Sequence, residues 1–422
     1  MTNLLSPLSR RILKAVTRPP DGLHDIDKAL LVAVLDGDHD VAQIVLDELV
    51  QHGVVVEHQP GRYKILDLTA VTEDVPGPGM DDLKAVITWH VERAVLADRT
   101  IDPWANRLSD AHNIPGTSTF ATAADAMEWF SANHNRLMAL LDELIERDWA
   151  ELCITLAEAL VGLTHHSGHH RDQQRAAQHG LVAINRLHWD PEPATTQAED
   201  DAREQRHNLR MAIFFARLAF ARTSLHDHQG ALDALTTAEN HARKANDDRV
   251  VATVLSVRGR AHHAAGNLDA AENELRDALA LDLAHGDNRR VALRRRRLGA
   301  VLAARGRHDA AFAELHQAAG AMRGLADPIG HARVLTVLGS AFIAANRPEE
   351  AFAPLVNALE TMMHIGSPGY VADIYVELAR ASRATGATTA ADEYYRDAIT
   401  HYRRGHRDDT AAAIEAERAG QQ

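Results

Sequence analysis

Cysteine, lysine and aromatic residues are scarce in this sequence, and each shortage excludes something. A single cysteine, Cys153, among 422 residues excludes an intramolecular disulfide framework and any cysteine-based zinc site. Because Cys153 lies in an apolar stretch with helical spacing, we expect a buried and inert thiol. Only 5% of the residues are aromatic, whereas alanine, leucine and arginine are abundant, and this composition suits helices rather than sheets.

Long apolar segments and an excess of positive charge are missing too. No run of about eighteen apolar residues occurs, which excludes a membrane-spanning helix. The segment Met1 to Val16 mixes basic with apolar residues, so we expect no signal peptide and a cytoplasmic protein. The net charge of −14 argues against a general nucleic-acid-binding protein, which would be basic.

Sequence motifs for catalysis are also absent. None of the five lysines follows a glycine, so the sequence has no Walker A phosphate-binding loop. It contains no His-Glu-x-x-His zinc helix and no Gly-x-Ser-x-Gly nucleophile elbow. We therefore predict a protein that is not an enzyme and that uses no cofactor.

A forty-residue repeat runs from about residue 206 to residue 405. In each unit a small residue is followed twelve residues later by an alanine, and seven residues after that by a second alanine. The fifteen positions are Ala219, Gly259, Gly299, Gly339, Ala379, Ala231, Ala271, Ala311, Ala351, Ala391, Ala238, Ala278, Ala318, Ala358 and Ala398. A fixed period of this length indicates stacked supersecondary units.

Each unit is predicted to be a pair of antiparallel helices, A and B. A turn signal such as Gly266-Asn267 separates two stretches whose apolar residues recur at helical spacing. Glycine or alanine at the crossing lets the two helix axes approach closely. Leu275, Leu315 and Leu355 supply bulk on the same face of helix B. One such pair cannot bury its apolar face alone, so neighbouring pairs must stack.

This spacing of small residues resembles the tetratricopeptide repeat, in which position 8 is small and positions 20 and 27 are alanine. The units here are forty residues long, against the usual 34 of that family, which implies longer helices. The resemblance implies an all-α solenoid of helical hairpins, with five repeats and a C-terminal capping helix over residues 201–422.

Residues 1–70 are expected to form a small winged-helix-like domain, in which three helices precede a β-hairpin. The expected helices and strands are Leu8 to Val16, Ile26 to Leu35, Val41 to Gln51, Val54 to Glu57 and Arg62 to Leu66. The third helix of a winged helix often reads DNA. Here it carries Asp40, Asp47 and Glu48 and no basic residue, so its surface would repel phosphates. We predict that this domain does not bind DNA.

Residues 71–80 have the proline and glycine content of a linker, and residues 81–200 are predicted to be a helical region that leads into the repeats. A second resemblance is carried by Arg62-Tyr63-Lys64-Ile65, Trp89-His90-Val91, Pro103-Trp104 and the segment Ala126 to Leu141. These stretches resemble the region C-terminal to the nucleotide-binding module in actinobacterial AfsR-type regulators of the STAND class. That resemblance implies transcriptional regulation or signalling. The nucleotide-binding module of that family is not expected in this sequence, which has no Walker A motif.

Four histidines form a weak candidate metal site. If their segment were helical they would make two i, i+4 pairs, a spacing that can hold one ion: His165, His166, His169 and His170. Ser167-Gly168 between the pairs indicates a turn instead. A solvated, histidine-rich turn without a metal is the simpler interpretation.

Arginines on the predicted inner wall form the better candidate site. In tetratricopeptide solenoids, positions 2, 5, 9, 12 and 13 of helix A line the concave groove. Counting from the small residue at position 8 places eight residues on this face: Arg260, Arg296, Arg333, Arg380, Arg383, Ser256, His263 and Ser340. Guanidinium groups bind carboxylates or phosphates through paired hydrogen bonds. The alternative is that these arginines only pair with acidic residues of neighbouring helices, such as Glu272, Asp373 or Glu377.

We therefore predict an interaction protein whose basic concave groove binds an acidic peptide, a protein segment or an anionic effector. Formation of a homo-oligomer is left open, and neither DNA nor a membrane is an expected partner. The alternative is a DNA-binding transcriptional regulator that uses the N-terminal winged helix on DNA and the repeats as a sensor and dimerisation domain.

Overall fold

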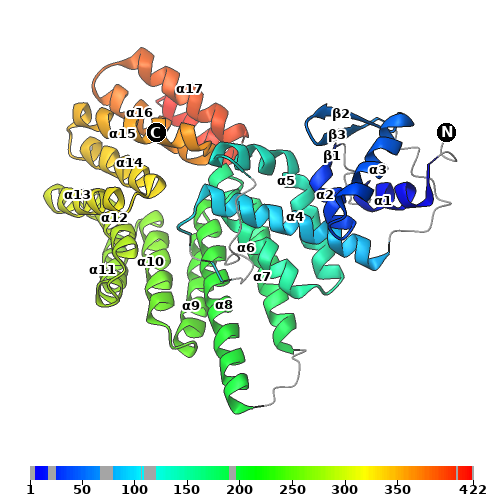
Figure 1. Cartoon of the computed structure of the whole chain (residues 1–422). Coiled ribbons are helices and arrows are strands. Elements are labelled where there is room, and N and C mark those ends of the chain that lie inside the picture. The colour runs from blue at the N-terminus through cyan, green and yellow to red at the C-terminus, as the bar shows by residue number, and fades with distance from the viewer. Residues whose placement is uncertain are drawn as a thin grey trace.

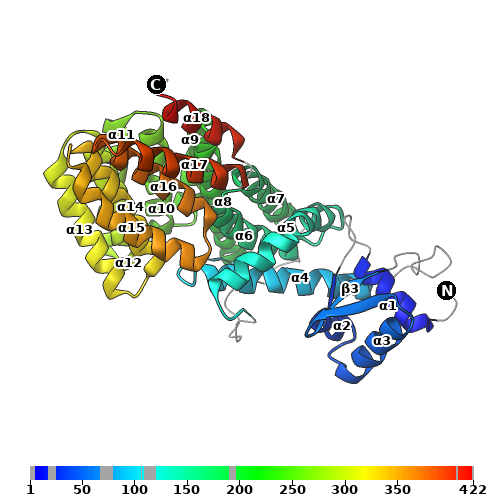
Figure 2. The ribbon, with the colours of Figure 1, turned by 90° about the horizontal axis from the view of Figure 1, so that it is seen from above.

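Helices dominate the computed structural model, which describes residues 5–17, 25–66, 79–105, 107–108, 120–189, 196–404 and 407–420. A small unit that contains the sheet stands at one end, and helical hairpins curve away from it (Figure 1). Figure 2 shows helix α4 (Met80–Ile101) running from this unit to the helices that precede the repeats. The fold is the predicted solenoid of helical hairpins. In the part of the chain that the structure describes, no helix is both long and apolar enough to cross a bilayer.

The N-terminal unit combines three helices with a three-stranded antiparallel sheet in the order β1, β3, β2. Its elements are α1 (Pro7–Thr17), β1 (Asp25–Asp27), α2 (Lys28–Val34), α3 (His39–Gln51), β2 (Val55–Gln59) and β3 (Arg62–Ile65). Ile26 lies opposite Tyr63 in the sheet. The prediction that Ile26 begins the second helix was therefore wrong. The helix begins at Lys28, because the Asp27 carboxylate accepts a hydrogen bond from the backbone N–H of Ala29 and caps it.

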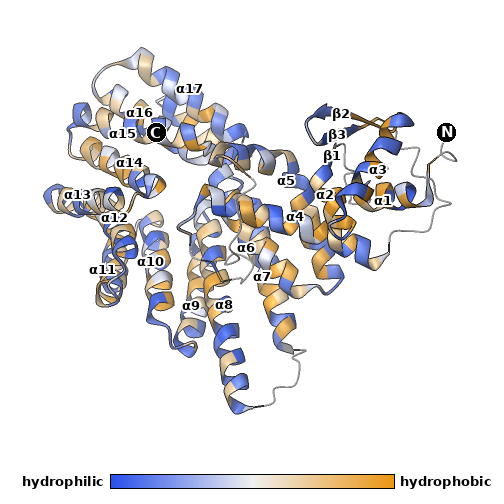
Figure 3. Ribbon diagram, in the orientation of Figure 1, coloured by the Kyte–Doolittle hydropathy of each residue, from blue (hydrophilic) through white to orange (hydrophobic). Residues whose placement is uncertain are grey.

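Four helices connect this unit to the repeats. They are α4, α5 (Ala123–Glu146), α6 (Ala150–Ser167) and α7 (His170–Trp189). Most residues of α6 are buried, and apolar residues follow one another along it (Figure 3). Helices α6 and α7 form a hairpin like those of the repeats, turning at the left-handed residue Gly168. Cys153 is fully buried in α6, as expected, and burial raises its pKa to about 12. Residues 67–78, which hold most of the predicted linker, lie outside the described residues.

Five hairpins and a final helix follow. They are α8 (Gln197–Ser224), α9 (His228–Lys244), α10 (Asp248–Ala264), α11 (Leu268–Ala284), α12 (Asn288–Ala304), α13 (His308–Gly324), α14 (Pro328–Ala344), α15 (Pro348–Ile365), α16 (Pro368–Ala384), α17 (Thr388–Arg404) and α18 (Asp408–Arg418). Helices α9 to α17 contain 17 or 18 residues each. Two such helices and two short turns account for the forty-residue period.

The turns recur every twenty residues and share one backbone feature. Each has a residue with positive φ: His226, Asn246, Gly266, Gly286, Gly306, Ala326, Asn346, Gly366 and Gly386. This left-handed residue ends one helix, since it lets the chain leave the helical path within one step. Asp247, Asp287 and Asp327 then cap the next helix with their carboxylates.

The small residues of the repeat are buried where helices A and B cross. A Cβ atom added to Gly299 would lie 2.6 Å from Cγ of Leu315, and one added to Gly339 would lie 2.5 Å from Cγ of Leu355. The alanines of the repeat are at most 3% exposed. The spacing read from the sequence therefore reports the packing between helices, as predicted.

The A helices α10, α12, α14 and α16 contact one another and form the inner wall of the array. The last repeat turns back to the helices that precede the first one, as Figures 1 and 2 show from two sides. Helix α16 packs against α6, where the backbones of Gly369 and Gly168 approach closely. Nδ1 of His166 lies 3.2 Å from Oγ of Ser367 at the same contact. The solenoid therefore closes on itself, because α16 near its end packs against α6 before its start.

Candidate functional site: an arginine-lined pocket

A pocket of about 280 Å³ opens on the inner wall of the closed array. Seven helices, from α6 to α16, contribute to it. Its main polar and aromatic residues are His165 on α6, Phe220 on α8, Arg260 on α10, Arg296 and Arg297 on α12, Arg333 on α14, and Tyr370 and Asp373 on α16. The structure thus brings together Arg260, Arg296 and Arg333 of the predicted groove.

The residues of this site follow a diagonal across successive repeats. Arg260, Arg296, Arg333 and Tyr370 are separated by 36, 37 and 37 residues, so each lies about one helical turn earlier in its repeat than the one before. Because stacked A helices cross at an angle, each successive helix presents a different turn to the pocket. A search for residues at this shifted spacing would have found Tyr370, which the sequence analysis missed.

Among the residues that the structure describes, no carboxylate forms an ion pair with the guanidinium groups in the pocket. Arg260 donates to the backbone oxygen of Phe220 at 3.2 Å and lies over the Phe220 ring, 3.8 Å from its centroid. Arg297 donates to Oγ of Ser256 at 2.6 Å. Arg333 lies over the ring of Tyr370. Within the described residues, none of these three arginines, nor Arg296, has a carboxylate oxygen within 4.0 Å.

Two of these arginines also keep a buried donor unused. Nε of Arg296 and Nε of Arg297 are buried and have no hydrogen-bond partner in the described part of the chain. A buried donor without an acceptor loses its hydration without replacement. Single arginine Nε atoms in this state also occur elsewhere in the described chain, as at Arg10, Arg93 and Arg222, but here two adjacent ones line one pocket. These unused donors belong to neighbouring guanidinium groups in one pocket. An anionic ligand bound there would accept hydrogen bonds from them.

Burial makes the positive charges of the pocket unfavourable. It lowers the pKa of Arg296 to about 9 and that of Arg260 to about 10, and the charge of Arg333 adds to both shifts. Burial also lowers the pKa of Arg297. Guanidinium groups nevertheless keep their protons at neutral pH. Asp373, the acidic residue of the lining, is already bound by the Tyr402 hydroxyl at 2.9 Å and by Arg407 at 3.4 Å. The pocket therefore carries a positive charge that its own residues do not balance.

His165 and Tyr370 form the wall where the array closes. Nε2 of His165 lies 2.6 Å from Oη of Tyr370, while Nδ1 of His165 is buried without a partner in the described chain. Burial lowers the pKa of His165 far below neutral pH and raises the pKa of Tyr370. Both side chains are therefore uncharged at neutral pH, and they can serve as hydrogen-bonding groups beside the arginines.

The rings of His166 and His170 lie 5.9 and 6.2 Å from the ring of His165, but the four candidate histidines are not arranged as a metal site. His165 and His166 end α6 and His170 begins α7, with the turn that the sequence indicated between them. Their ring nitrogens contact separate partners: Tyr370 for His165, Ser367 for His166, Ser167 for His169 and Gln173 for His170. The i, i+4 geometry that the metal hypothesis needed is wrong for this segment, because the helix ends at Ser167. Among the described residues no cluster of three ligating side chains is placed to hold a metal ion.

Arg380 and Arg383 lie away from the pocket, against the capping helix α18. Nε and Nη2 of Arg380 each donate to the Glu417 carboxylate at 2.8 Å, and Nη1 donates to Glu377 at 2.8 Å. Arg383 donates to the backbone oxygens of Glu417 and Arg418. Arg380 and Arg383 therefore follow the alternative interpretation, in which the arginines only pair with groups of neighbouring helices.

The remaining predicted residues occupy supporting places. Ser256 is fully buried behind Arg297 and accepts its hydrogen bond. His263 lines the pocket. Ser340 donates to the backbone oxygen of Thr336 at 3.2 Å, one helical turn earlier.

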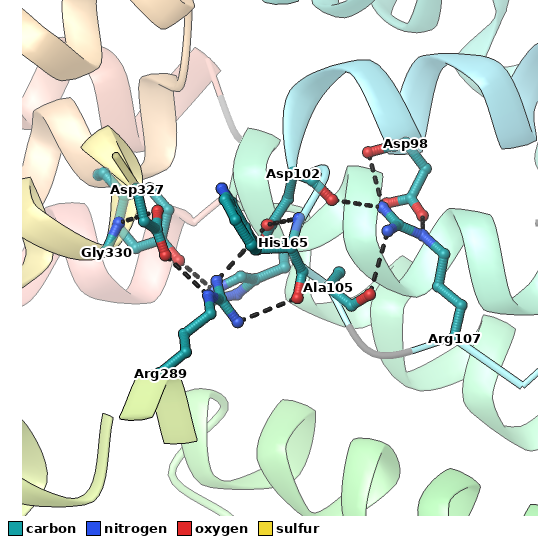
Figure 4. A network of polar contacts seen from close by, with 10 residues as sticks. Asp98, Asp102, Ala105, Arg107, His165, Arg289, Asp327 and Gly330 are labelled. Atoms are coloured by element: carbon teal, nitrogen blue, oxygen red, sulfur yellow. Dashed lines mark hydrogen bonds and ion pairs between the residues drawn. The ribbon is translucent and has the colours of Figure 1, made fainter. Parts of the chain in front are cut away.

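A second closing contact lies near the pocket and is balanced in charge (Figure 4). Arg289, at the start of α12, pairs with Asp327 at 2.8 Å and with Asp102, beyond the end of α4, at 3.7 Å. Arg107 pairs with Asp98 at 2.6 Å, and burial raises the pKa of Asp98 to about 6. Both arginines of this network have carboxylate partners, unlike the four arginines that line the pocket.

The comparisons with known proteins do not assign the chain to a family. No protein-family model and no curated protein matches the chain. Among solved structures it is similar to aspartyl phosphate phosphatase F from Bacillus subtilis (TM-score 0.49, 10% identity, 94% of this chain and 92% of that one). It is similar to a Rap protein in complex with competence and sporulation factor (0.48, 14%, 90% and 96%). A third is a STAND protein with a tetratricopeptide repeat sensor from Pyrococcus horikoshii (0.44, 12%, 99% and 64%). At such identities and scores these likenesses say nothing about the ligand of the pocket.

Proposed function

We propose that the chain is a non-catalytic regulatory protein whose inner arginine pocket binds the acidic group of a peptide, a protein segment or an anionic effector. The observation that carries this proposal is the set of four arginines, Arg260, Arg296, Arg297 and Arg333, that line one pocket without a carboxylate partner in the described chain. A bound anion would supply acceptors to the unused Nε donors and balance the charge. Ion pairs formed in a recess gain more than ion pairs on an open surface.

The regulatory part of the proposal rests on the resemblance to AfsR-type regulators given above. The element order of residues 7–65, with a hairpin after the third helix, agrees with a winged-helix unit. Its helix α3 exposes Asp40 and Asp47 and carries no lysine or arginine. Since such a surface repels phosphates, we assign ligand binding to the pocket rather than DNA binding to α3.

Calorimetric titration with a panel of anions tests the proposal. Inorganic phosphate, succinate and a tetraglutamate peptide are titrated into the full chain at one fixed ionic strength. We expect at least one to bind, and its affinity to fall about tenfold or more in the Arg296→Gln/Arg333→Gln variant, since hydrogen bonds to charged groups contribute about 1.5–3 kcal/mol each.

The matched control is Arg380→Gln/Arg383→Gln, which removes the same two charges outside the pocket and should leave the affinity unchanged. Circular dichroism checks that both variants keep their helices. If no anion binds, or if the pocket variant binds as tightly as the natural chain, the proposed function is wrong.

A further inference from the structure

We propose, building on the function proposed above, that the ligand of the pocket is a small phosphate monoester rather than a carboxylate. The pocket brings four guanidinium groups and no free carboxylate around about 280 Å³. A carboxylate brings a single negative charge. A phosphate monoester brings about −1.5 to −2 at neutral pH, concentrated on three strong acceptor oxygens. The compact dianion therefore balances the charge of about two of these arginines, whereas one carboxylate balances one.

The directions from which the arginines arrive also favour phosphate. A carboxylate is planar, and one guanidinium satisfies its two oxygens through a pair of parallel hydrogen bonds. Here the guanidinium groups come from three different helices, α10, α12 and α14, and His165 and Tyr370 face them from α6 and α16. A tetrahedral group, whose oxygens point in several directions, can accept from several of these donors. The unused Nε donors of Arg296 and Arg297 and the unused Nδ1 of His165 are further groups for it to engage.

The size and lining of the pocket limit what can be attached to the phosphate. A volume of about 280 Å³ lies at the lower end of the roughly 300–1,000 Å³ that is usual for ligand pockets. This volume suits a phosphate group with a small organic part, not several residues of an extended chain. Ala300, Val301 and Val337 give one part of the lining an apolar character, while Thr336 and His263 add hydrogen-bonding groups. The organic part would lie against these residues.

The decisive experiment compares ligands that share a benzene ring and differ in the acidic groups attached to it. Phenyl phosphate, phthalate and benzoate are titrated into the full chain by calorimetry and in thermal unfolding at fixed ionic strength. We expect phenyl phosphate to bind at least about tenfold more tightly than phthalate, and benzoate to bind most weakly. Because the monoester takes up a proton near pH 6, its affinity should fall about tenfold between pH 7.5 and pH 5.

Three variants locate the binding. Arg296→Gln/Arg333→Gln should abolish the stabilisation by phenyl phosphate, and Arg380→Gln/Arg383→Gln should retain it. Arg296→Lys keeps the charge but loses the planar fork, and we expect it to weaken phenyl phosphate about tenfold. It also covers the case in which the double variant does not fold.

Each contrary result has a distinct meaning. If phthalate binds as tightly as phenyl phosphate and both depend on Arg296 and Arg333, the choice of phosphate is overturned and the proposed function stands. A peptide with one phosphoserine that binds more tightly than phenyl phosphate would overturn the assignment to a small ligand. If none of these compounds binds in a manner that depends on the two arginines, the inference and the proposed function both fail.

Discussion

Arg260 and Arg380 occupy the same position of their repeats, three units apart, yet they meet opposite environments. Arg260 lies over the ring of Phe220 in the pocket and has no carboxylate partner in the described chain. Arg380 is bound by two carboxylates, those of Glu377 and Glu417. The difference comes from what packs next. Beyond Arg260 lies another repeat with more arginines, whereas beyond Arg380 lies the capping helix α18 with its acidic Glu417. Position in the repeat decides which way a side chain faces, and the neighbouring element decides its partner.

The arginine run on α12 shows the same contrast within one helical turn. Arg294 pairs with the buried carboxylate of Asp282 at 2.8 Å, and Arg295 pairs with Glu314 at 2.6 Å. Arg296 and Arg297 line the pocket without such partners in the described chain. The paired arginines should raise the free energy of unfolding. The pocket arginines should lower it unless a ligand is bound. Variants of the two groups should therefore change the free energy of unfolding in opposite directions.

The largest effect is expected for Arg294→Ala. The change leaves the buried Asp282 with only the longer contact to Arg290, at 3.5 Å. Breaking a buried ion pair on one side costs about 3 kcal/mol or more, so we expect the free energy of unfolding in urea to fall by about that amount. A loss below about 1 kcal/mol would remove the distinction between the paired and the pocket arginines on α12.

A smaller change of opposite sign is expected for Arg296→Met. Methionine keeps most of the volume but removes a buried charge that has no partner, so we expect the free energy of unfolding to rise by about 1 kcal/mol. The variant should at the same time lose the response to phenyl phosphate. Urea unfolding with and without that compound measures both. A variant that is less stable than the natural chain would show that Arg296 is compensated after all.

The smallest effect is expected for Arg380→Gln. This side chain is partly exposed, and exposed ion pairs contribute about 0–1 kcal/mol each because water and salt screen them. Thermal unfolding should detect a loss that shrinks further as salt is added, with anion binding unchanged. A large, salt-independent loss would mean that α18 depends on this arginine for its place.

The packing of the repeats could be predicted from sequence because its causes recur at a fixed interval. Gly299 must be small since Leu315 occupies the space beside it, and the same relation returns forty residues later in Gly339 and Leu355. Three pocket arginines were found in the same way, from their positions on helix A. The short strand β1 was missed because three residues carry too little pattern, and Asp27 reads equally well as a residue near a helix start, which it also is.

The closing wall of the pocket could not be predicted from local patterns. His165 and Tyr370 are 205 residues apart and belong to different kinds of segment, one before the repeats and one in the last of them. Their contact depends on the summed curvature of every hairpin between them. The partners of Arg380 and Arg383 depend in the same way on where α18 comes to lie. The forty-residue period describes the packing of one unit on the next. It does not determine where the two ends of the array lie relative to each other.

That meeting of the ends has a consequence for how this chain can evolve. An ordinary solenoid tolerates the gain or loss of a unit, because each unit touches only the next. Here one duplicated or deleted hairpin would move Gly369 and Tyr370 out of reach of α6 and would open the wall of the pocket. Closure of the array therefore fixes the number of hairpins. Relatives that share the pocket should have the same number.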